Sequence, residues 1–257
     1  MLEQHHSVLV LQTNMKFTLA LLLVIAASSS TLAKDLFKAS HKVRLSDSSA
    51  ATNQYTDLYD SINSGGTRVR LTDYTPSMRN QNFDNRVESL CVTGIWLLYA
   101  DENYNANNLA GSNYWVFGDN YCSNLPSQFK NMASSARFTG APDAWKADTI
   151  NFYMNDYFIG AEEYTYSDLN ELQNNDRTKS LVVTGCTAWT LYEHSSYKGL
   201  CKCVYPASTS SCTPGFYEKS TTLGYLANTI SSVRKGCYCS SKALPTNYNS
   251  DSQEGFF

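Results

Sequence analysis

Apolar and polar residues alternate along short segments of this chain, which is the pattern of half-buried β-strands. Segments rich in β-branched and aromatic residues that show this pattern include 67–72, 113–117 and 149–153. Asn, Asp, Ser and Gly separate them, as in the turns between strands. No long amphipathic helix is indicated, apart from one helical turn predicted near 166–172. The pattern therefore predicts an all-β protein.

One spacing occurs four times along the chain: an aromatic residue, an aromatic or small residue five positions later, and Gly or Ala two positions after that. The four copies are Tyr59, Ser64, Gly66; Tyr99, Tyr104, Ala106; Tyr153, Phe158, Gly160; and Tyr192, Tyr197, Gly199. They lie about 40 to 55 residues apart, which is the range of a supersecondary repeat. The glycine predicts a hairpin with positive φ that folds over the sheet, and Ala106 weakens the second copy.

A short polar hexad follows each copy of the repeat. The four hexads are 84–89, 130–135, 174–179 and 227–232. The second and fourth copies also carry a tryptophan three residues before the tyrosine, at Trp96 and Trp189, so the units alternate as A, B, A, B. Because one unit cannot bury a sheet face alone, two units are expected to form one sandwich. We therefore expect one domain at 52–139, a linker at 140–148 and a second domain at 149–239.

On these motifs the chain resembles the βγ-crystallin family. The Greek-key unit of that family has an aromatic residue, then a second aromatic and a glycine in a folded hairpin, and ends at Asn/Asp-Asn/Asp-x-x-Ser/Thr-Ser. Residues 192–199 match the hairpin best, and Trp-x-x-Tyr occurs twice where the family has it. The resemblance covers most of residues 55–237. It implies two tandem Greek-key β-sandwich domains, each of two four-stranded motifs.

The resemblance also implies calcium sites, for which Ca²⁺ needs oxygen ligands. In that family one unit supplies carbonyl and Asn/Asp oxygens, and the fifth-position hydroxyl of the partner unit completes the site. The implied ligands are Asn174, Asn175 and Asp176 with Ser231, and Asn228 with Thr178, in the second domain; and Asp84 and Asn85 with Ser134, and Asn131 with Glu88, in the first. Departures from the family pattern are Lys130, Ala227, Glu88 and Lys179. Weak calcium binding is therefore expected mainly in the second domain, and the alternative is that the hexads are only structural turns.

The chain has eight cysteines, which predict disulfides in a secreted protein. Cys91 and Cys122 are the only two in the first domain and are expected to pair. The second domain contains Cys186, Cys201, Cys203, Cys212, Cys237 and Cys239, and several pairings of these six are open. Two cysteines that lie two positions apart in one strand are poorly placed to form a disulfide with each other. Cys201 is therefore not expected to pair with Cys203, nor Cys237 with Cys239. The Cys-x-Cys spacing is also a poor match to zinc sites.

The start of the chain predicts a secretory signal peptide at 1–33. A basic residue, the apolar run 19–27 and small residues up to Ala33 indicate cleavage after Ala33. Translation is expected to start at Met15, and a start at the first methionine with a long leader is the alternative. The apolar run is too short for a good membrane span. The protein is therefore expected to be secreted and extracellular, without a membrane span.

The remaining segments and the charge of the chain add two expectations. Residues 34–51 and 240–257 are polar and without period, so we expect a flexible arm and a flexible tail. The formal net charge is −3 and the sequence has no basic stripe, so a nucleic-acid partner is not expected. The 18 tyrosines are expected to pack within the protein and not to stack on nucleic-acid bases. The expected partner is extracellular and unknown, and the oligomeric state cannot be read from the sequence.

Catalysis is not indicated by the polar residues. Of four histidines, only His194 lies inside a predicted domain, in a hairpin loop that the repeat itself explains. The neighbouring carboxylates at 162–163 and 101–102 are expected to be solvated loop charges. We therefore expect a secreted, non-enzymatic structural or matrix protein that binds calcium weakly. The alternatives are a binding or defence module on the same fold, such as a proteinase inhibitor or toxin-like protein, and a hydrolase that depends on His194.

Overall fold

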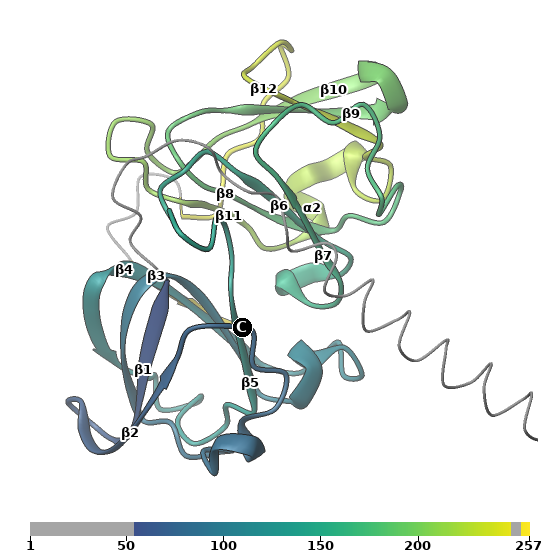
Figure 1. Cartoon of the computed structure of the whole chain (residues 1–257). Helices are drawn as coiled ribbons and strands as arrows, with labels where there is room; N and C mark the ends of the chain where they lie inside the picture. Colours follow the sequence, from purple (N-terminus) through teal and green to yellow (C-terminus); the bar gives the residue numbers. More distant parts are fainter. Residues whose placement is uncertain (1–53, 248–252) are drawn as a thin grey trace, which may run out of the picture. The chain divides into compact units, whose positions relative to one another are not determined.

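The computed structural model of the chain describes residues 54–247 and 253–257. The predicted signal peptide at 1–33, the expected start at Met15 and the arm at 34–51 lie outside the described residues. The described part consists mainly of β-strands with short helical turns, which confirms the all-β prediction (Figure 1).

Domain 1 is built on one six-stranded sheet with the order β13-β4-β3-β1-β2 and β5 paired to β3. Its elements are β1 (Tyr55–Ser61), β2 (Gly65–Leu71), η1 (Met78–Gln81), β3 (Ser89–Tyr99), η2 (Glu102–Asn105), β4 (Asn113–Asn124) and β5 (Ser135–Phe138), with β13 (Glu254–Phe256) from the end of the chain. The first half of β3 pairs with β1 and its second half pairs with β5. The long β3 and β4 therefore connect strands of both repeat units.

Domain 2 has two separate sheets, with the orders β11-β8-β6-β7 and β10-β9-β12. Its elements are β6 (Ile150–Tyr153), η3 (Asp156–Phe158), β7 (Glu162–Thr165), β8 (Ser180–Val183), β9 (Trp189–His194), η4 (Ser195–Tyr197), β10 (Lys198–Val204), β11 (Gly215–Tyr217), α2 (Ser220–Leu223), η5 (Gly224–Leu226) and β12 (Ser232–Lys235). Strand β11 belongs to the second repeat unit but pairs with β8 of the first. Each unit is thus incomplete without its partner, as expected for interlocked Greek keys.

The helical turn predicted near 166–172 is absent from the structure. Leu169 instead forms an antiparallel bridge with Val233, in which each N–H donates to the carbonyl of the other residue at 2.9 Å. Because its backbone groups are taken by strand pairing, this segment cannot close helical hydrogen bonds. The single α-helical turn among the described residues is α2, after β11.

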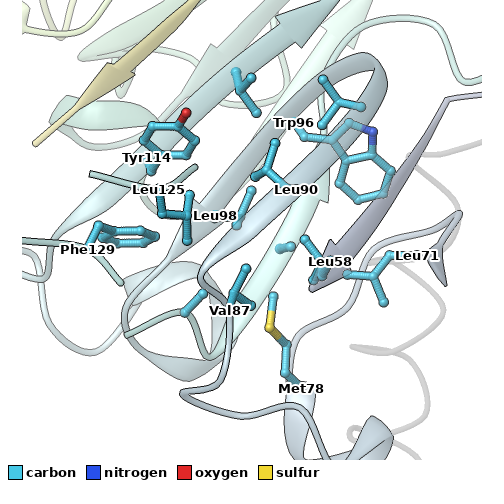
Figure 2. Packing of buried hydrophobic residues seen from close by; sticks show 14 of the residues in the cluster. Leu58, Leu71, Met78, Val87, Leu90, Trp96, Leu98, Tyr114, Leu125 and Phe129 are labelled. Atoms are coloured by element: carbon cyan, nitrogen blue, oxygen red, sulfur yellow. The ribbon is translucent and has the colours of Figure 1, made fainter. Parts of the chain in front are cut away.

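Each domain buries its own apolar core. The core of domain 1 gathers leucines and aromatic residues from both repeat units, with Leu58, Trp96, Tyr114 and Phe129 almost fully buried (Figure 2). The core of domain 2 contains the equivalent Trp189, also fully buried. The two tryptophans that mark the B units are therefore core residues.

A third apolar cluster joins the two domains. It combines residues of domain 1, residues of domain 2 and Trp145 of the predicted linker: Ile95, Leu97, Tyr99, Tyr104, Trp115, Phe117, Trp145, Tyr153, Phe158, Ile159, Val182 and Phe216. Trp115 stacks on Phe216 with 3.9 Å between ring centroids. The two domains therefore share an apolar cluster in addition to their own cores.

Arg137 of β5 lies inside this shared interface and is only 2% exposed. Its guanidinium donates to the Tyr99 hydroxyl at 3.0 Å, to the Gly160 carbonyl at 3.0 Å and to the Phe158 carbonyl at 2.5 Å. The rings of Tyr99, Tyr104 and Tyr153 also lie within cation–π distance of it. One cation of domain 1 thus satisfies buried carbonyls of domain 2.

The carboxy-terminal segment expected to be a flexible tail at 240–257 is largely packed. Ala243 belongs to the core of domain 2, the Asn247 amide donates to the Pro214 carbonyl at 2.9 Å, and β13 pairs antiparallel with β4 of domain 1. The physical reason is that β4 and β11 offer strand edges with free backbone groups, which this segment satisfies. Residues 248–252 lie outside the described residues.

Four disulfides pair all eight cysteines, and the predicted Cys91–Cys122 bridge is confirmed. The bridges are Cys91–Cys122, Cys186–Cys212, Cys201–Cys239 and Cys203–Cys237. Neither Cys-x-Cys pair closes on itself, as expected. Two parallel bridges instead tie β10 to the segment that follows β12.

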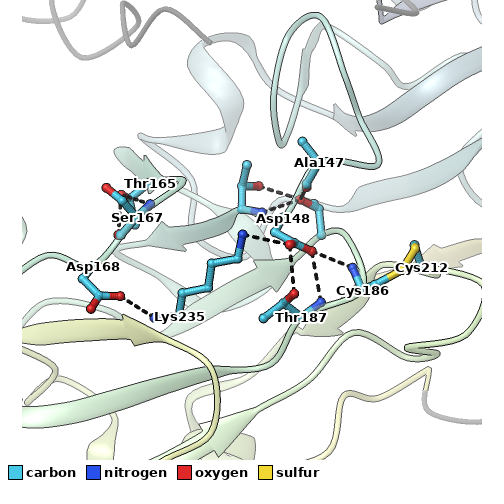
Figure 3. Close-up of polar contacts among 11 residues, drawn as sticks. Ala147, Asp148, Thr165, Ser167, Asp168, Cys186, Thr187, Cys212 and Lys235 are labelled. Carbon is cyan, nitrogen blue, oxygen red and sulfur yellow. Dashed lines mark hydrogen bonds and ion pairs between the residues drawn. A yellow bond between two sulfur atoms is a disulfide. The ribbon is translucent and has the colours of Figure 1, made fainter. Parts of the chain in front are cut away.

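A partly buried aspartate, Asp148, anchors the start of domain 2 (Figure 3). Its carboxylate accepts hydrogen bonds from the backbone N–H of Cys186 at 2.7 Å and of Thr187 at 3.0 Å, and it contacts the Lys235 ammonium at 2.8 Å. Burial alone would raise the pKa of Asp148, but the bonds from Lys235, Thr187 and Cys186 outweigh it and hold the pKa below its usual 3.8. Asp148 thereby joins the linker to β12 and to the Cys186 loop.

Replacing Arg137 by Met should destabilise the protein and loosen the coupling of the domains. The apolar side chain leaves the Gly160 carbonyl without this donor, and it removes one of the two donors to the Phe158 carbonyl, which the Tyr99 hydroxyl also bonds at 2.7 Å. We therefore expect the free energy of unfolding to fall by about 2 to 4 kcal/mol. Arg137→Lys should be intermediate, because an ammonium cannot reach all three acceptors as the guanidinium does. Calorimetric unfolding of the full chain measures both effects. Arg68→Met on the exposed part of β2 is the control, and equal melting of the two Met variants would contradict the role of Arg137.

Replacing Asp148 by Asn should lower stability in a pH-dependent way. Because the pKa of the folded carboxyl is lowered, its contribution is present above the unfolded pKa of about 3.9 and is lost as the pH falls through the folded value. We expect a loss of about 1 to 3 kcal/mol at pH 7 that shrinks toward zero as the pH falls through the lowered pKa of the folded carboxyl. Denaturant unfolding at several pH values checks this. Asp168→Asn, at a more exposed carboxylate, is the control, and a loss that does not vary with pH would be inconsistent with a lowered pKa.

Candidate functional site

A serine clamp occurs once in each repeat unit and connects the hexad to the hairpin. The serine hydroxyl accepts from a hairpin N–H and donates to a hairpin carbonyl; the four serines are Ser89, Ser135, Ser180 and Ser232, and the four N–H donors are Ser64, Tyr104, Phe158 and Tyr197. These donor residues have φ of 58 to 61°. Such left-handed backbone costs energy in non-glycine residues and persists only where neighbouring contacts hold it. The clamp supplies those contacts.

The hexads of one domain also cross each other through their backbones. The second hexad residue has left-handed φ in every unit, and its N–H donates to the carbonyl of the fourth residue of the partner hexad; the pairs are Asn85 to Ala133, Asn131 to Val87, Asp176 to Ile230 and Asn228 to Thr178. This places the residue at the fifth position next to the second residue of the partner hexad. Four crossed sites result, two in each domain.

The third hexad runs from 175 to 180, one residue later than the predicted 174–179. Thr178 is therefore the fourth residue and not the fifth, and it is buried with a hydroxyl that has no hydrogen-bond partner. Lys179 takes the fifth position. The sequence permits two frames here because Asn174-Asn175 and Asn175-Asp176 can each begin the motif. The signal for the correct frame is Ser180, which aligns with the closing serines of the other three hexads.

The Ser231 site of domain 2 brings together three kinds of oxygen. The Ser231 hydroxyl donates to the Glu193 carbonyl at 2.7 Å and lies 3.2 Å from Oδ1 of Asp176. Of the other ligands predicted for this site, Asn175 is exposed, and the backbone N–H of Asn174 is bound by the Glu163 carboxylate at 2.8 Å. A carboxylate oxygen and a carbonyl oxygen thus both lie within hydrogen-bond distance of one hydroxyl, and all three are of the kinds that bind Ca²⁺.

The Lys179 site is the other crossed site of domain 2. It consists of Asn228 and the fifth-position Lys179, with Thr178 directed into the core. An ammonium group donates hydrogen bonds and offers no lone pair to a metal ion. This site does not fit Ca²⁺.

The Ser134 site of domain 1 resembles the Ser231 site in geometry. The Ser134 hydroxyl lies 3.4 Å from Oδ1 of Asn85, so an amide stands where domain 2 has a carboxylate. Asp84 is the first residue of the same hexad, and its carboxylate is 3.2 Å from Nε of Arg79. The hydroxyl and the amide oxygen are therefore neighbours, and the carboxylate of the adjacent Asp84 is paired with a guanidinium.

The Glu88 site of domain 1 is closed by its own side chains. The Asn131 amide donates to the Glu88 carboxylate at 3.1 Å. Asp60, in the hairpin beside this site, is paired with Arg86 at 2.6 Å. The Glu88 carboxylate therefore already accepts an amide donor, and the fifth position of this site carries no hydroxyl.

The carboxylate pair at 162–163 differs from the prediction of solvated loop charges. Both residues lie on β7, where Glu162 accepts from the hydroxyls of Tyr74 and Tyr153, and buried Glu163 accepts from the N–H of Gln173 and Asn174. Burial of these carboxylates is stable because each one has hydrogen-bond donors. Their role is structural.

Further chemistry is not favoured by the described groups. The His194 side chain is 64% exposed, with Nε2 3.9 Å from a Glu193 oxygen, which is no ordered catalytic pair. Within 54–247 and 253–257, no three His, Cys, Asp or Glu side chains gather as metal ligands.

Comparison with known proteins agrees with this geometry. The beta/gamma crystallin family model matches residues 56–123 and 149–235. The fold is similar to that of geodin, a beta-gamma crystallin from Geodia cydonium, with a TM-score of 0.55, 19% identity, and coverage of 72% of this chain and 99% of geodin. A betagamma-crystallin from an archaeon matches with a TM-score of 0.30 and 26% identity over 35% of this chain and 98% of its own.

No match was found among curated proteins. The family model covers more than half of the chain, on both domains that carry the clamp and the crossed hexads. The chain therefore belongs to the beta/gamma crystallin family.

Proposed function

We propose that this protein is a secreted, non-enzymatic structural or matrix protein that binds one Ca²⁺ per chain, at the Ser231 site of domain 2. Members of the family are generally structural and not enzymes, which supports the first part of the proposal. The convergence of the Ser231 hydroxyl, the Glu193 carbonyl and the Asp176 carboxylate supports the second part.

The proposed compartment follows from the chemistry of the cysteines. Four disulfides are typical of proteins that fold and remain in an oxidising environment. A signal peptide at 1–33 remains an expectation from the sequence. Among the described helices, none has the length and apolar character needed to cross a membrane.

The Ser231 site is preferred because it keeps a carboxylate that is not neutralised. No ion pair to Asp176 is present among the described residues, whereas Asp84 of domain 1 is paired with Arg79. The remaining ligands would be water and backbone carbonyls, since Ca²⁺ takes six to eight oxygens in flexible geometry. Such a partly exposed site with one carboxylate is expected to bind weakly.

Calorimetric titration of the full mature chain with CaCl₂ tests the proposal. We expect one equivalent to bind, and a free Ca²⁺ concentration 100 times the dissociation constant to raise stability by about 2.7 kcal/mol. Asp176→Asn and Ser231→Ala should each weaken binding by at least about tenfold, because each removes one of few direct ligands.

Thr178→Val is the matched control for these variants. It changes a hydroxyl of the neighbouring hexad that points into the core, so it should leave calcium binding unchanged and leave stability equal or slightly higher, since an unpaired buried hydroxyl is removed. Equal melting temperatures in calcium and in chelator would remove the calcium assignment and leave the hexads as structural turns.

A further inference from the structure

We propose that Arg79 takes the place of a metal cation at the Ser134 site, so that domain 1 is closed to Ca²⁺ by a side chain of its own. The inference concerns domain 1 and rests on the proposed calcium chemistry of the equivalent site in domain 2. Arg79 is outside the hexads and was not identified by the sequence motifs.

The backbone places Arg79 and Gln173 at equivalent points of the two domains. The N–H of Met78 donates to the Ser134 carbonyl at 2.8 Å, and the N–H of Leu172 donates to the Ser231 carbonyl at 2.8 Å. The next residue along the chain is Arg79 in domain 1 and Gln173 in domain 2. The same attachment to the fifth-position serine therefore carries a cation in one domain and a neutral amide in the other.

The guanidinium of Arg79 lies between two carboxylates at the edge of the Ser134 site. Its Nε is 3.2 Å from Oδ2 of Asp84 and 3.3 Å from Oε1 of Glu102. The Ser77 hydroxyl donates to the same Glu102 oxygen at 2.6 Å and holds that carboxylate in position. One positive charge thus neutralises acidic groups from the hexad of the first unit and from the hairpin of the second.

Arg79 also shares a surface hollow with the predicted ligands. The walls of this hollow include Arg79, Asn85, Ala100, Glu102 and Ser134. Ala100 follows Tyr99 as Glu193 follows Tyr192, so it supplies the hairpin position whose carbonyl contacts the serine in domain 2. A metal ion at this point would share its surroundings with the guanidinium.

Electrostatic repulsion then gives the two domains different affinities for Ca²⁺. A fixed positive charge about 4 to 6 Å from a divalent cation weakens its binding by at least about tenfold even at the dielectric constant of water. In domain 2, Gln173 contributes no charge, and Glu163 binds its N–H at 2.9 Å.

A reciprocal exchange of the two residues tests the inference. Full-length wild type, Arg79→Gln and Gln173→Arg are titrated with CaCl₂ by calorimetry at fixed ionic strength. We expect Arg79→Gln to gain one equivalent of Ca²⁺ that Ser134→Ala removes, and Gln173→Arg to bind at the Ser231 site at least about tenfold more weakly than wild type. Arg68→Gln is the control, because it removes the same charge from an exposed position of β2.

The outcomes distinguish this inference from the proposed function. If Arg79→Gln binds no more Ca²⁺ than wild type and the control, the inference is overturned, whatever the Ser231 site does. If wild type binds none, the proposed function fails, and the Arg79→Gln titration still decides the inference by the presence or absence of an equivalent sensitive to Ser134→Ala. Because Arg79 is 69% exposed, the variant is expected to fold, and its melting curve verifies this.

Discussion

The serine clamp is the contact on which the rest of each repeat unit depends. One hydroxyl holds a left-handed hairpin over the sheet and, by the same bonds, sets the frame of the hexad. Once the frame is set, the crossed backbone bonds decide which residue faces the partner hexad. The clamp recurs in all four units, whereas the residues that it presents differ.

Those differences give the two domains unequal chemistry on an equal scaffold. The fifth position is Glu88 or Lys179 in the A units and Ser134 or Ser231 in the B units. A hydroxyl oxygen can bind a cation, whereas a lysine ammonium cannot. Where an arginine lies near the hydroxyl, its guanidinium competes with a metal cation for the same surroundings. Only the Ser231 site therefore combines converging oxygens with a carboxylate that has no ion pair among the described residues.

The shared interface makes the two domains one folding unit. Arg137 satisfies carbonyls of domain 2 from a strand of domain 1, and the surrounding aromatic rings exclude water from these bonds. The carboxy-terminal segment adds a second connection, since it packs on domain 2 and ends as a strand on β4. Calcium bound in one domain would therefore stabilise the whole protein and not domain 2 alone.

The sequence by itself determined the features that local backbone physics requires. Strand alternation, the aromatic residue of each hairpin, the glycine of three of the four hairpins, the alternating tryptophans and the Cys91–Cys122 pair were all predicted, because each depends on nearby residues or on a single available partner. Only the tertiary structure decided the frame of the third hexad, since Asn174-Asn175 and Asn175-Asp176 both match the start of the motif and the bonds of Ser180 to its hairpin select the second. It alone also decided the pairing of six cysteines, the docking of residues 240–247 and β13, and the position of Arg79 between Asp84 and Glu102. These depend on which distant segments meet, and no local pattern encodes that.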